Sequence, residues 1–104
     1  MPHILISTTS DDREELVAIA ERLIGDRLAA CCQITGPLTS FYRWQGEIEQ
    51  SIEWMCLIKT QTELYAAVEQ AIREQHHYVE PEIVATEIKL GSAGYLKWID
   101  ENVL

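Results

Sequence analysis

The order of hydrophobic periodicities along the chain constrains its fold more than any other feature. Two stretches repeat apolar residues at the spacing of an amphipathic helix, and each lies between segments of strand-like composition. The first stretch carries Leu16, Ile19, Ala20, Leu23 and Ile24, and the second carries Leu64, Ala67, Val68, Ala71 and Ile72. Each pattern predicts one helix with a single buried face.

Five runs of apolar, β-branched or alternating residues predict the strands. They are Ile4–Thr9, Leu28–Ile34, Leu38–Trp44, Ile48–Thr60 and Glu82–Ile88. Gly36 and Pro37 interrupt the sequence between the second and third runs, and Gly46 predicts a hairpin turn between the third and fourth. Near the C-terminus, Tyr95, Trp98 and Ile99 form the apolar stripe of a short helix.

Capping residues indicate where the two longer helices begin. Either Ser10 or Asp11 can cap the first helix, and Glu14 completes a box with Asp11. Residues 60–63, Thr-Gln-Thr-Glu, predict a second capping box.

The two runs on either side of Gly36 and Pro37 count as one interrupted strand, so the predicted order is β-α-β-β-α-β followed by a terminal helix. Two crossover helices on one face of a single sheet satisfy this order most simply. We therefore expect an α/β (α+β) protein with a ferredoxin-like sandwich and an extended hairpin. A chain of 104 residues is long enough for one core, so residues 1–104 form a single predicted domain.

Four aromatic residues lie on the two strands of the predicted hairpin: Phe41, Tyr42, Trp44 and Trp54. The face of the sheet opposite the helices remains bare in a monomer, and exposed aromatic surface usually marks a partner surface. We therefore expect the chain to associate with copies of itself.

The net charge of the chain indicates which classes of partner it can bind. With 17 acidic and 8 basic residues, the chain has a net charge of −9. This excess repels phosphate backbones and attracts cations, so nucleic acid is not an expected partner.

The N-terminal residues contain no basic segment, and the apolar run Ile4–Ile6 is too short for a signal peptide or a membrane span. Three cysteines, Cys31, Cys32 and Cys56, lie in apolar surroundings and leave one thiol unpaired. We expect a cytoplasmic protein that does not contact membranes and whose thiols pack as small hydrophobic groups.

Five blocks of sequence, in order, closely resemble the CutA divalent-cation-tolerance protein family across nearly the whole chain. The blocks are Arg27–Cys31, Gly36–Glu49, Leu57–Thr60, His76–Ile83 and Tyr95–Ile99. The resemblance implies a homotrimer of ferredoxin-like subunits whose hairpin strands pair across interfaces, with an architecture similar to that of the PII signalling proteins. It also implies a role in divalent-ion tolerance and the cellular response to metal ions.

Three positions depart from the family pattern, and one of them is Val79, where the family often has Glu or Gln. His77 replaces the usual proline between His76 and Tyr78. Ser7 stands where members with proposed copper ligation have a cysteine, which argues against a sulfur-containing site of that type.

The residues with metal-ligand character are His76, His77, Glu80 and Glu82. Imidazole nitrogen and carboxylate oxygen together suit zinc, copper or nickel. Adjacent histidines on an extended loop point apart, so their spacing alone does not define a site. We expect a divalent ion, copper or zinc, to bind here without being required for folding.

A second candidate site comprises Lys59, Tyr78 and Glu82, which match family positions and can line a cleft between subunits. Lysine can neutralise an anionic ligand, tyrosine supplies a stacking face and a hydroxyl, and glutamate accepts hydrogen bonds. A Lys-Glu pair that fixes an interface is the alternative.

No catalytic arrangement is evident. The serines lack a nucleophile elbow, the adjacent cysteines lie in an apolar strand, and no Gly-rich phosphate loop is present. We expect a metal-binding protein that is not an enzyme. The alternatives are a PII-like sensor of a small anionic metabolite and a structural trimer that assembles with partner proteins.

Overall fold

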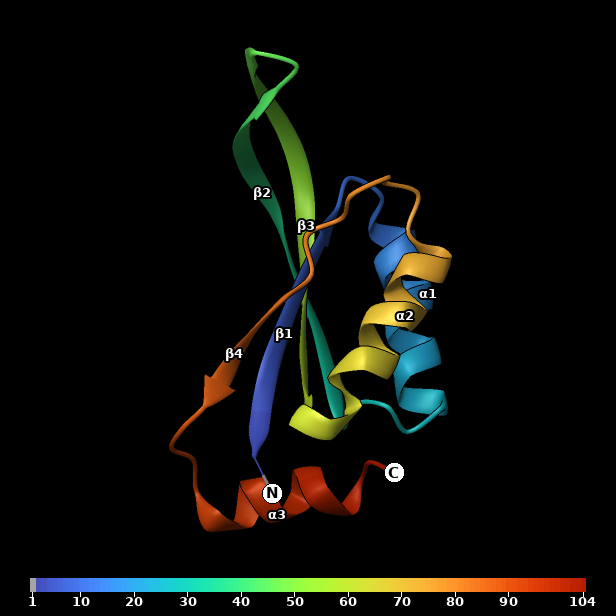
Figure 1. The fold of residues 1–104 in the computed structure, drawn as a ribbon, viewed down its shortest axis with the longest axis vertical. Coiled ribbons are helices and arrows are strands. Elements are labelled where there is room, and N and C mark those ends of the chain that lie inside the picture. The colour runs from blue at the N-terminus through green and yellow to red at the C-terminus, as the bar shows by residue number, and fades with distance from the viewer. Residues whose placement is uncertain (1) are drawn as a thin grey trace.

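The computed structural model describes residues 2–104 and confirms the predicted order of elements (Figure 1). The elements are β1 (His3–Ser10), α1 (Arg13–Gly25), β2 (Cys31–Trp44), β3 (Glu47–Gln61), the 3-10 helix η1 (Thr62–Leu64), α2 (Tyr65–Gln75), β4 (Val84–Ile88) and α3 (Ala93–Glu101). The last strand is shorter at its N-terminal end than the predicted Glu82–Ile88.

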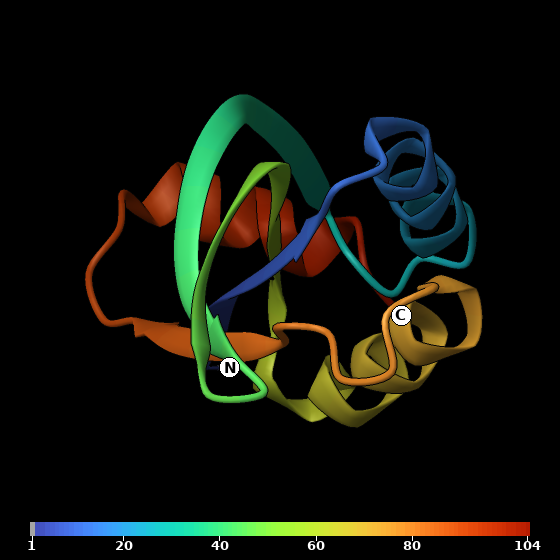
Figure 2. The same cartoon turned by 90° about the horizontal axis from the view of Figure 1, so that it is seen from above.

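The four strands form one antiparallel sheet in the order β2-β3-β1-β4, which is the ferredoxin-like arrangement. Both α1 and α2 cover the same face of this sheet (Figures 1 and 2). The core between helices and sheet consists mainly of Ile4, Ile6, Leu16, Ile19, Leu23, Cys56, Ile58, Val68 and Ile72.

Strands β2 and β3 continue beyond the body of the domain as a long hairpin (Figure 1). The molecule measures 45 × 25 × 22 Å as a result. Gln45 and Gly46 form the two-residue turn, and both have positive φ, as a hairpin turn of this length favours. The register shifts between Thr35 and Leu38. The interruption expected at Gly36 is therefore a bulge within one continuous strand.

Both predicted helix caps were wrong. Asp12 caps α1, because its Oδ1 accepts the backbone N–H groups of Glu14 and Glu15 at 3.0 and 3.4 Å. Thr60 still belongs to β3, and its hydroxyl donates to the carbonyl oxygen of Leu28 at 2.7 Å.

Helix α3 crosses the end of the sheet, where it buries Ile99 (Figure 1). Asp100 fastens it by two short contacts, with His3 Nε2 at 2.8 Å and with Gln61 Nε2 at 2.7 Å. Within residues 2–104, every helix is too short or too polar to cross a membrane.

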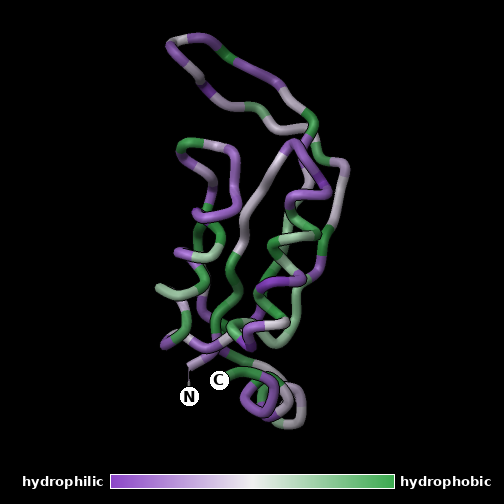
Figure 3. The backbone as a smooth tube through the Cα atoms, turned by 90° about the vertical axis from the view of Figure 1, so that its right-hand side faces the viewer, coloured by the Kyte–Doolittle hydropathy of each residue, from purple (hydrophilic) through white to green (hydrophobic). Residues whose placement is uncertain are grey.

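Hydrophobic residues recur among hydrophilic ones along the protruding hairpin (Figure 3). Phe41, Tyr42 and Trp44 are exposed, with 69, 45 and 59% of their surface accessible. Trp54 differs from these three because it is partly buried against the core of its own chain. The hairpin thus offers apolar side chains that this chain alone does not cover.

Gly36 is the glycine whose replacement should cost most. Its φ is +144°, and a Cβ there would lie 2.7 Å from Trp54 Cδ1 and 3.2 Å from the carbonyl oxygen of Glu53. We expect Gly36→Ala to lower the free energy of unfolding by about 2–4 kcal/mol, through backbone strain and overpacking. Urea denaturation measures the change.

Gly94→Ala is the matched control. This glycine lies in the first turn of α3 with nothing within 4 Å of the added carbon. We expect equal or slightly higher stability, since alanine favours helices. Equal losses in both variants would contradict the proposed contact with Trp54.

Candidate functional site

The candidate site forms where the loop after α2 meets the start of α1. Helix α2 ends at Gln75, and His76 follows in an extended conformation with φ −82° and ψ 135°. This turn directs the loop back towards the end of β1 (Figure 1). Residues far apart in sequence, Glu15 and the two histidines, consequently become neighbours.

His76 is buried and held by backbone groups. Its Nε2 lies 2.7 Å from the carbonyl oxygen of Thr9, which can only accept, so this nitrogen carries the proton. The other nitrogen, Nδ1, accepts the backbone N–H of Tyr78 at 3.1 Å and lies 3.3 Å from Glu15 Oε2. Proteins usually orient a metal-binding histidine through one N–H to a carbonyl, as here, and an ion at Nδ1 would take the place of the Tyr78 N–H.

Glu15 is the central carboxylate of the cluster, and 11% of its side chain is exposed. It accepts the Ser10 hydroxyl at 2.8 Å and the backbone N–H of His77 at 2.8 Å. Burial alone would raise the pKa of Glu15, but the hydrogen bonds from His77 and Ser10 outweigh it and lower the pKa. The carboxyl group is therefore ionised at neutral pH.

His77 lies between two carboxylates. Its Nδ1 contacts both oxygens of Glu15 at 2.9 Å, and its Nε2 lies 3.0 Å from Asp11 Oδ1. The hydrogen bond with Glu15 raises the pKa of His77, and the nearby negative charges of Glu15 and Asp11 add to the effect. A proton on His77 thus occupies a position that a cation can also take.

One ligand atom from each of Glu15, His76 and His77 lies within 4.8 Å of the others. The sequence predicted the two histidines but missed Glu15, which lies 62 positions before His77. In the sequence Glu15 looks like an ordinary acidic residue of a first helical turn, so only the fold identifies it.

The structure does not bring all four predicted metal ligands together. Glu80 accepts from the guanidinium group of Arg73 at 3.3 Å, and Glu82 accepts from the hydroxyl of Ser7 at 3.1 Å. Both carboxylates lie outside the cluster that the two histidines form with Glu15.

The residues predicted to line a ligand cleft also lie apart from one another within one chain. Lys59 Nζ donates to Gln33 at 3.1 Å and to the hydroxyl of Tyr95 at 3.3 Å, so it is not paired with Glu82. Tyr78 belongs instead to the neighbourhood of the histidines, with its ring 4.7 Å from each imidazole.

The hydroxyl of Tyr78 connects this neighbourhood to the hairpin. It donates to Glu53 at 2.7 Å and accepts the backbone N–H of Asp11 at 3.0 Å. Burial and the contact with Glu53 raise the pKa of Tyr78, so its proton is retained. Tyr78 therefore positions the loop and does not have a free hydroxyl.

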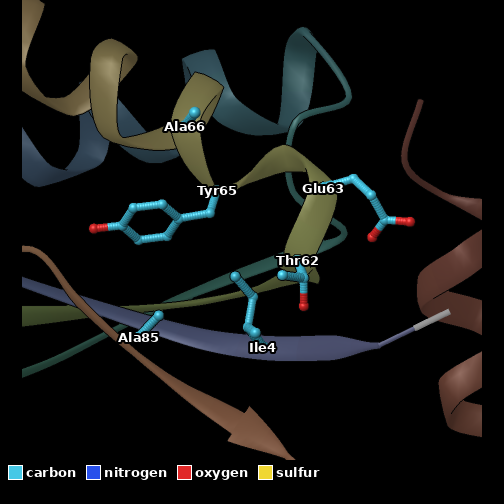
Figure 4. A pocket seen from close by; sticks show the side chains of 6 residues that line it. All are labelled: Ile4, Thr62, Glu63, Tyr65, Ala66 and Ala85. Carbon is cyan, nitrogen blue, oxygen red and sulfur yellow. The ribbon is translucent and has the colours of Figure 1, made fainter.

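A surface depression lies elsewhere, between the start of α2 and the strands β1 and β4 (Figure 4). It has a volume of about 550 Å³ and is lined by Ile4, Thr62, Glu63, Tyr65, Ala66 and Ala85. Most of this lining is apolar, and it contains neither histidine of the cluster.

Comparisons of the sequence with known proteins all point to the same family. Residues 4–102 match the model of the CutA1 divalent ion tolerance protein family. The chain is 41% identical over 99 residues to the divalent-cation tolerance protein CutA of Thermus thermophilus, covering 95% of this chain and 94% of that one. It is 40% identical over 101 residues to CutA of Archaeoglobus fulgidus, covering 97% and 98%.

Solved structures agree with the sequence comparison. The structure of CutA1 from Oryza sativa superimposes with a TM-score of 0.96 at 31% identity, covering 100% of this chain and 95% of that one. The Archaeoglobus fulgidus structure, described as a periplasmic divalent cation tolerance protein, gives a TM-score of 0.94 at 39% identity, covering 98% and 99%. The resemblance noted from the sequence is confirmed, and the chain belongs to the CutA1 divalent ion tolerance protein family.

Proposed function

We propose that this protein binds a divalent transition-metal ion, copper or zinc, through Glu15, His76 and His77, and so contributes to the cellular response to metal ions. The orientation of His76 is the main support. Its Nε2–H is fixed on the carbonyl of Thr9, and this leaves Nδ1 directed towards Glu15. The net charge of −9 favours cations near the protein.

The donor set favours ions of intermediate softness. Two imidazole nitrogens and one carboxylate oxygen suit zinc, copper(II) or nickel, whereas calcium and magnesium require more oxygen ligands. An ion at this cluster replaces the proton that His77 shares with Glu15. Asp11, 3.0 Å from Nε2 of His77, then stabilises that imidazole from its other side.

Substitution of the central carboxylate tests the site. We expect Glu15→Gln to weaken zinc and copper(II) binding by about 100-fold or more, because it removes an anionic ligand and keeps the side-chain shape. Isothermal titration of the metal-free protein measures the affinity.

Glu82→Gln is the matched control, since Glu82 contacts Ser7 outside the cluster. The ligand set expected from sequence, His76 and His77 with Glu80 and Glu82, predicts the opposite pattern. Loss of affinity in Glu82→Gln with full affinity in Glu15→Gln would contradict the site proposed here.

Metal affinity should depend on pH through His77. Because the pKa of His77 is raised above its ordinary value of 6.5, the ion must displace a proton at neutral pH. We expect zinc affinity to rise between about pH 5 and pH 8. Titrations across this range, with His77→Gln as control, should show a smaller slope in the variant. A flat profile in the unsubstituted protein would contradict displacement of this proton.

The metal-free fold has a different pH dependence. The pKa of Glu15 is lowered on folding, so its contribution is complete above its ordinary value of 4.5 and is lost as pH falls through the folded pKa. The pKa of His77 is raised, so its contribution is complete below 6.5 and is lost as pH rises through the folded pKa. Together they stabilise the metal-free protein most between these two values.

We further propose that the protein is a homotrimer assembled through the hairpin. Phe41, Tyr42 and Trp44 expose apolar surface on β2, and Ile48 and Ile52 expose 72 and 52% of theirs on β3. A second copy of the chain is the simplest partner for such a surface.

Introducing charge on the hairpin should dissociate the assembly. We expect the double variant Phe41→Glu, Trp44→Glu to sediment as a monomer where the unsubstituted protein sediments as a trimer, because burying two carboxylates in an apolar interface is costly. Ile24→Glu adds a similar charge on α1 and should remain trimeric. Dissociation in Ile24→Glu alone would contradict assembly through the hairpin.

A small anionic metabolite is a second candidate ligand. Among residues 2–104 no carboxylate forms an ion pair with Lys59, whose ammonium group contacts Gln33 and the Tyr95 ring, 5.3 Å from its centroid. An unneutralised lysine beside an aromatic ring can bind an anion and stack a planar group. Sensing of this kind is the PII-like alternative. It does not involve Glu15, so the variants above distinguish the two functions.

We also propose a cytoplasmic location. Cys31, Cys32 and Cys56 are free thiols, and free thiols persist in reducing compartments.

A further inference from the structure

Two cysteines face the core from neighbouring strands beneath α1. Cys32 of β2 pairs with Ile58, and Ile34 pairs with Cys56 of β3, so the two cysteines are diagonal neighbours across the ladder. Cys56 is fully buried and Cys32 is partly buried against the same core. Both side chains therefore point to the helix-covered face of the sheet, into the same apolar core.

A third polar group lies beside this pair without a partner. Thr8 of β1 is directly opposite Cys56 in the register, so their side chains lie on the same face of the sheet. Thr8 is fully buried, and its hydroxyl oxygen has no hydrogen-bond partner. An unsatisfied buried hydroxyl destabilises the folded state, which makes this arrangement unusual for simple core packing.

Cys32 also lines an opening to solvent. A shallow depression of about 460 Å³ beside the C-terminal half of α1 is bordered by Ala20, Glu21, Ile24, Gly25 and Cys32. The carboxylate of Glu21 at its margin attracts cations. The buried thiol pair therefore has an entrance suited to a positively charged ligand.

We propose that Cys32 and Cys56 bind one soft, monovalent metal ion such as Cu(I), with Thr8 as the supporting hydrogen-bond donor. Thiolate sulfur selects soft ions of this type. When the ion replaces the two thiol protons, which are released to solvent, the thiolate of Cys56 becomes a stronger acceptor for the Thr8 hydroxyl than the thiol was. Binding thus gives the buried Thr8 hydroxyl a hydrogen-bond partner.

The number of ligands favours a two-coordinate ion over zinc. Structural zinc sites use four ligands in a tetrahedron. Within residues 2–104, no group of three or more histidine, cysteine, aspartate or glutamate ligands includes either cysteine. Cys31 cannot complete such a set, because successive residues of β2 point to opposite faces.

The register also favours an ion over a disulfide. Diagonal neighbours in an antiparallel ladder have Cα atoms roughly 7–8 Å apart, whereas disulfides usually require about 4.4–6.8 Å. An ion between the two sulfurs spans a longer distance than a direct S–S bond.

Silver(I) is a suitable probe, because it shares the softness of Cu(I) and is not readily oxidised by air. The reduced, metal-free protein is titrated with Ag(I), and binding is followed by native mass spectrometry and by the ultraviolet charge-transfer absorption of the metal thiolate. We expect one ion per chain in the unsubstituted protein and in Cys31→Ser. Cys32→Ser and Cys56→Ala should weaken binding by about 100-fold or more, since each leaves a single sulfur ligand.

Two further variants test whether Thr8 only supports the ligands, and whether this site is independent of the proposed divalent-metal site. Thr8→Val should weaken silver binding by about tenfold, as loss of an outer hydrogen bond does. Glu15→Gln should leave silver binding unchanged, so failure of the proposed divalent site does not affect this test. Because Cys56 is fully buried, Cys32→Ser decides the outcome if Cys56→Ala does not fold.

Three results would overturn the proposal: retention of Ag(I) by Cys32→Ser, equal loss of Ag(I) in Cys31→Ser, or formation of a Cys32–Cys56 disulfide by hydrogen peroxide in a protein that binds no Ag(I).

Discussion

The antiparallel pairing of β1 with β3 is the interaction on which the rest of the structure depends. At its centre Ile6 lies opposite Ile58, and both are fully buried beneath the helices. A shift of one residue would turn this apolar set to the open face and remove the surface that α1 and α2 cover, so the register is strongly specified. It also fixes which polar groups at the end of β1 meet the helices.

Both proposed metal sites follow from that register. Thr9 presents the carbonyl oxygen that fixes the tautomer of His76, and Ser10 donates to Glu15. One residue earlier, Thr8 stands opposite Cys56. Consecutive residues of one strand therefore support two different donor sets, nitrogen and oxygen near the surface and sulfur within the core. A rigid strand holds the groups that hydrogen-bond to metal ligands more precisely than a loop can.

Periodicity in the sequence predicted the helices, the hairpin and the order of strands, because those depend on which residues share a face. The caps could not be predicted in the same way. Pairing of β1 continues to Ser10, opposite Trp54, so the strand occupies the first predicted cap and Asp12 takes its place. The same limit explains Glu15, since its partners are set by tertiary contacts and local spacing carries no sign of them.

Net charge attracts cations without deciding where they bind. Several carboxylates are already committed to internal partners, such as Glu80 to Arg73 and Glu53 to Tyr78. Glu15 differs because its partner His77 holds a proton that a metal ion can replace. The thiol pair differs again, because it lies in an apolar core. An ion must lose its hydration shell to enter that core, and this cost excludes strongly hydrated ions. Discrimination between ions in this fold therefore rests on donor softness and burial at each site, and the acidic surface acts on all cations alike.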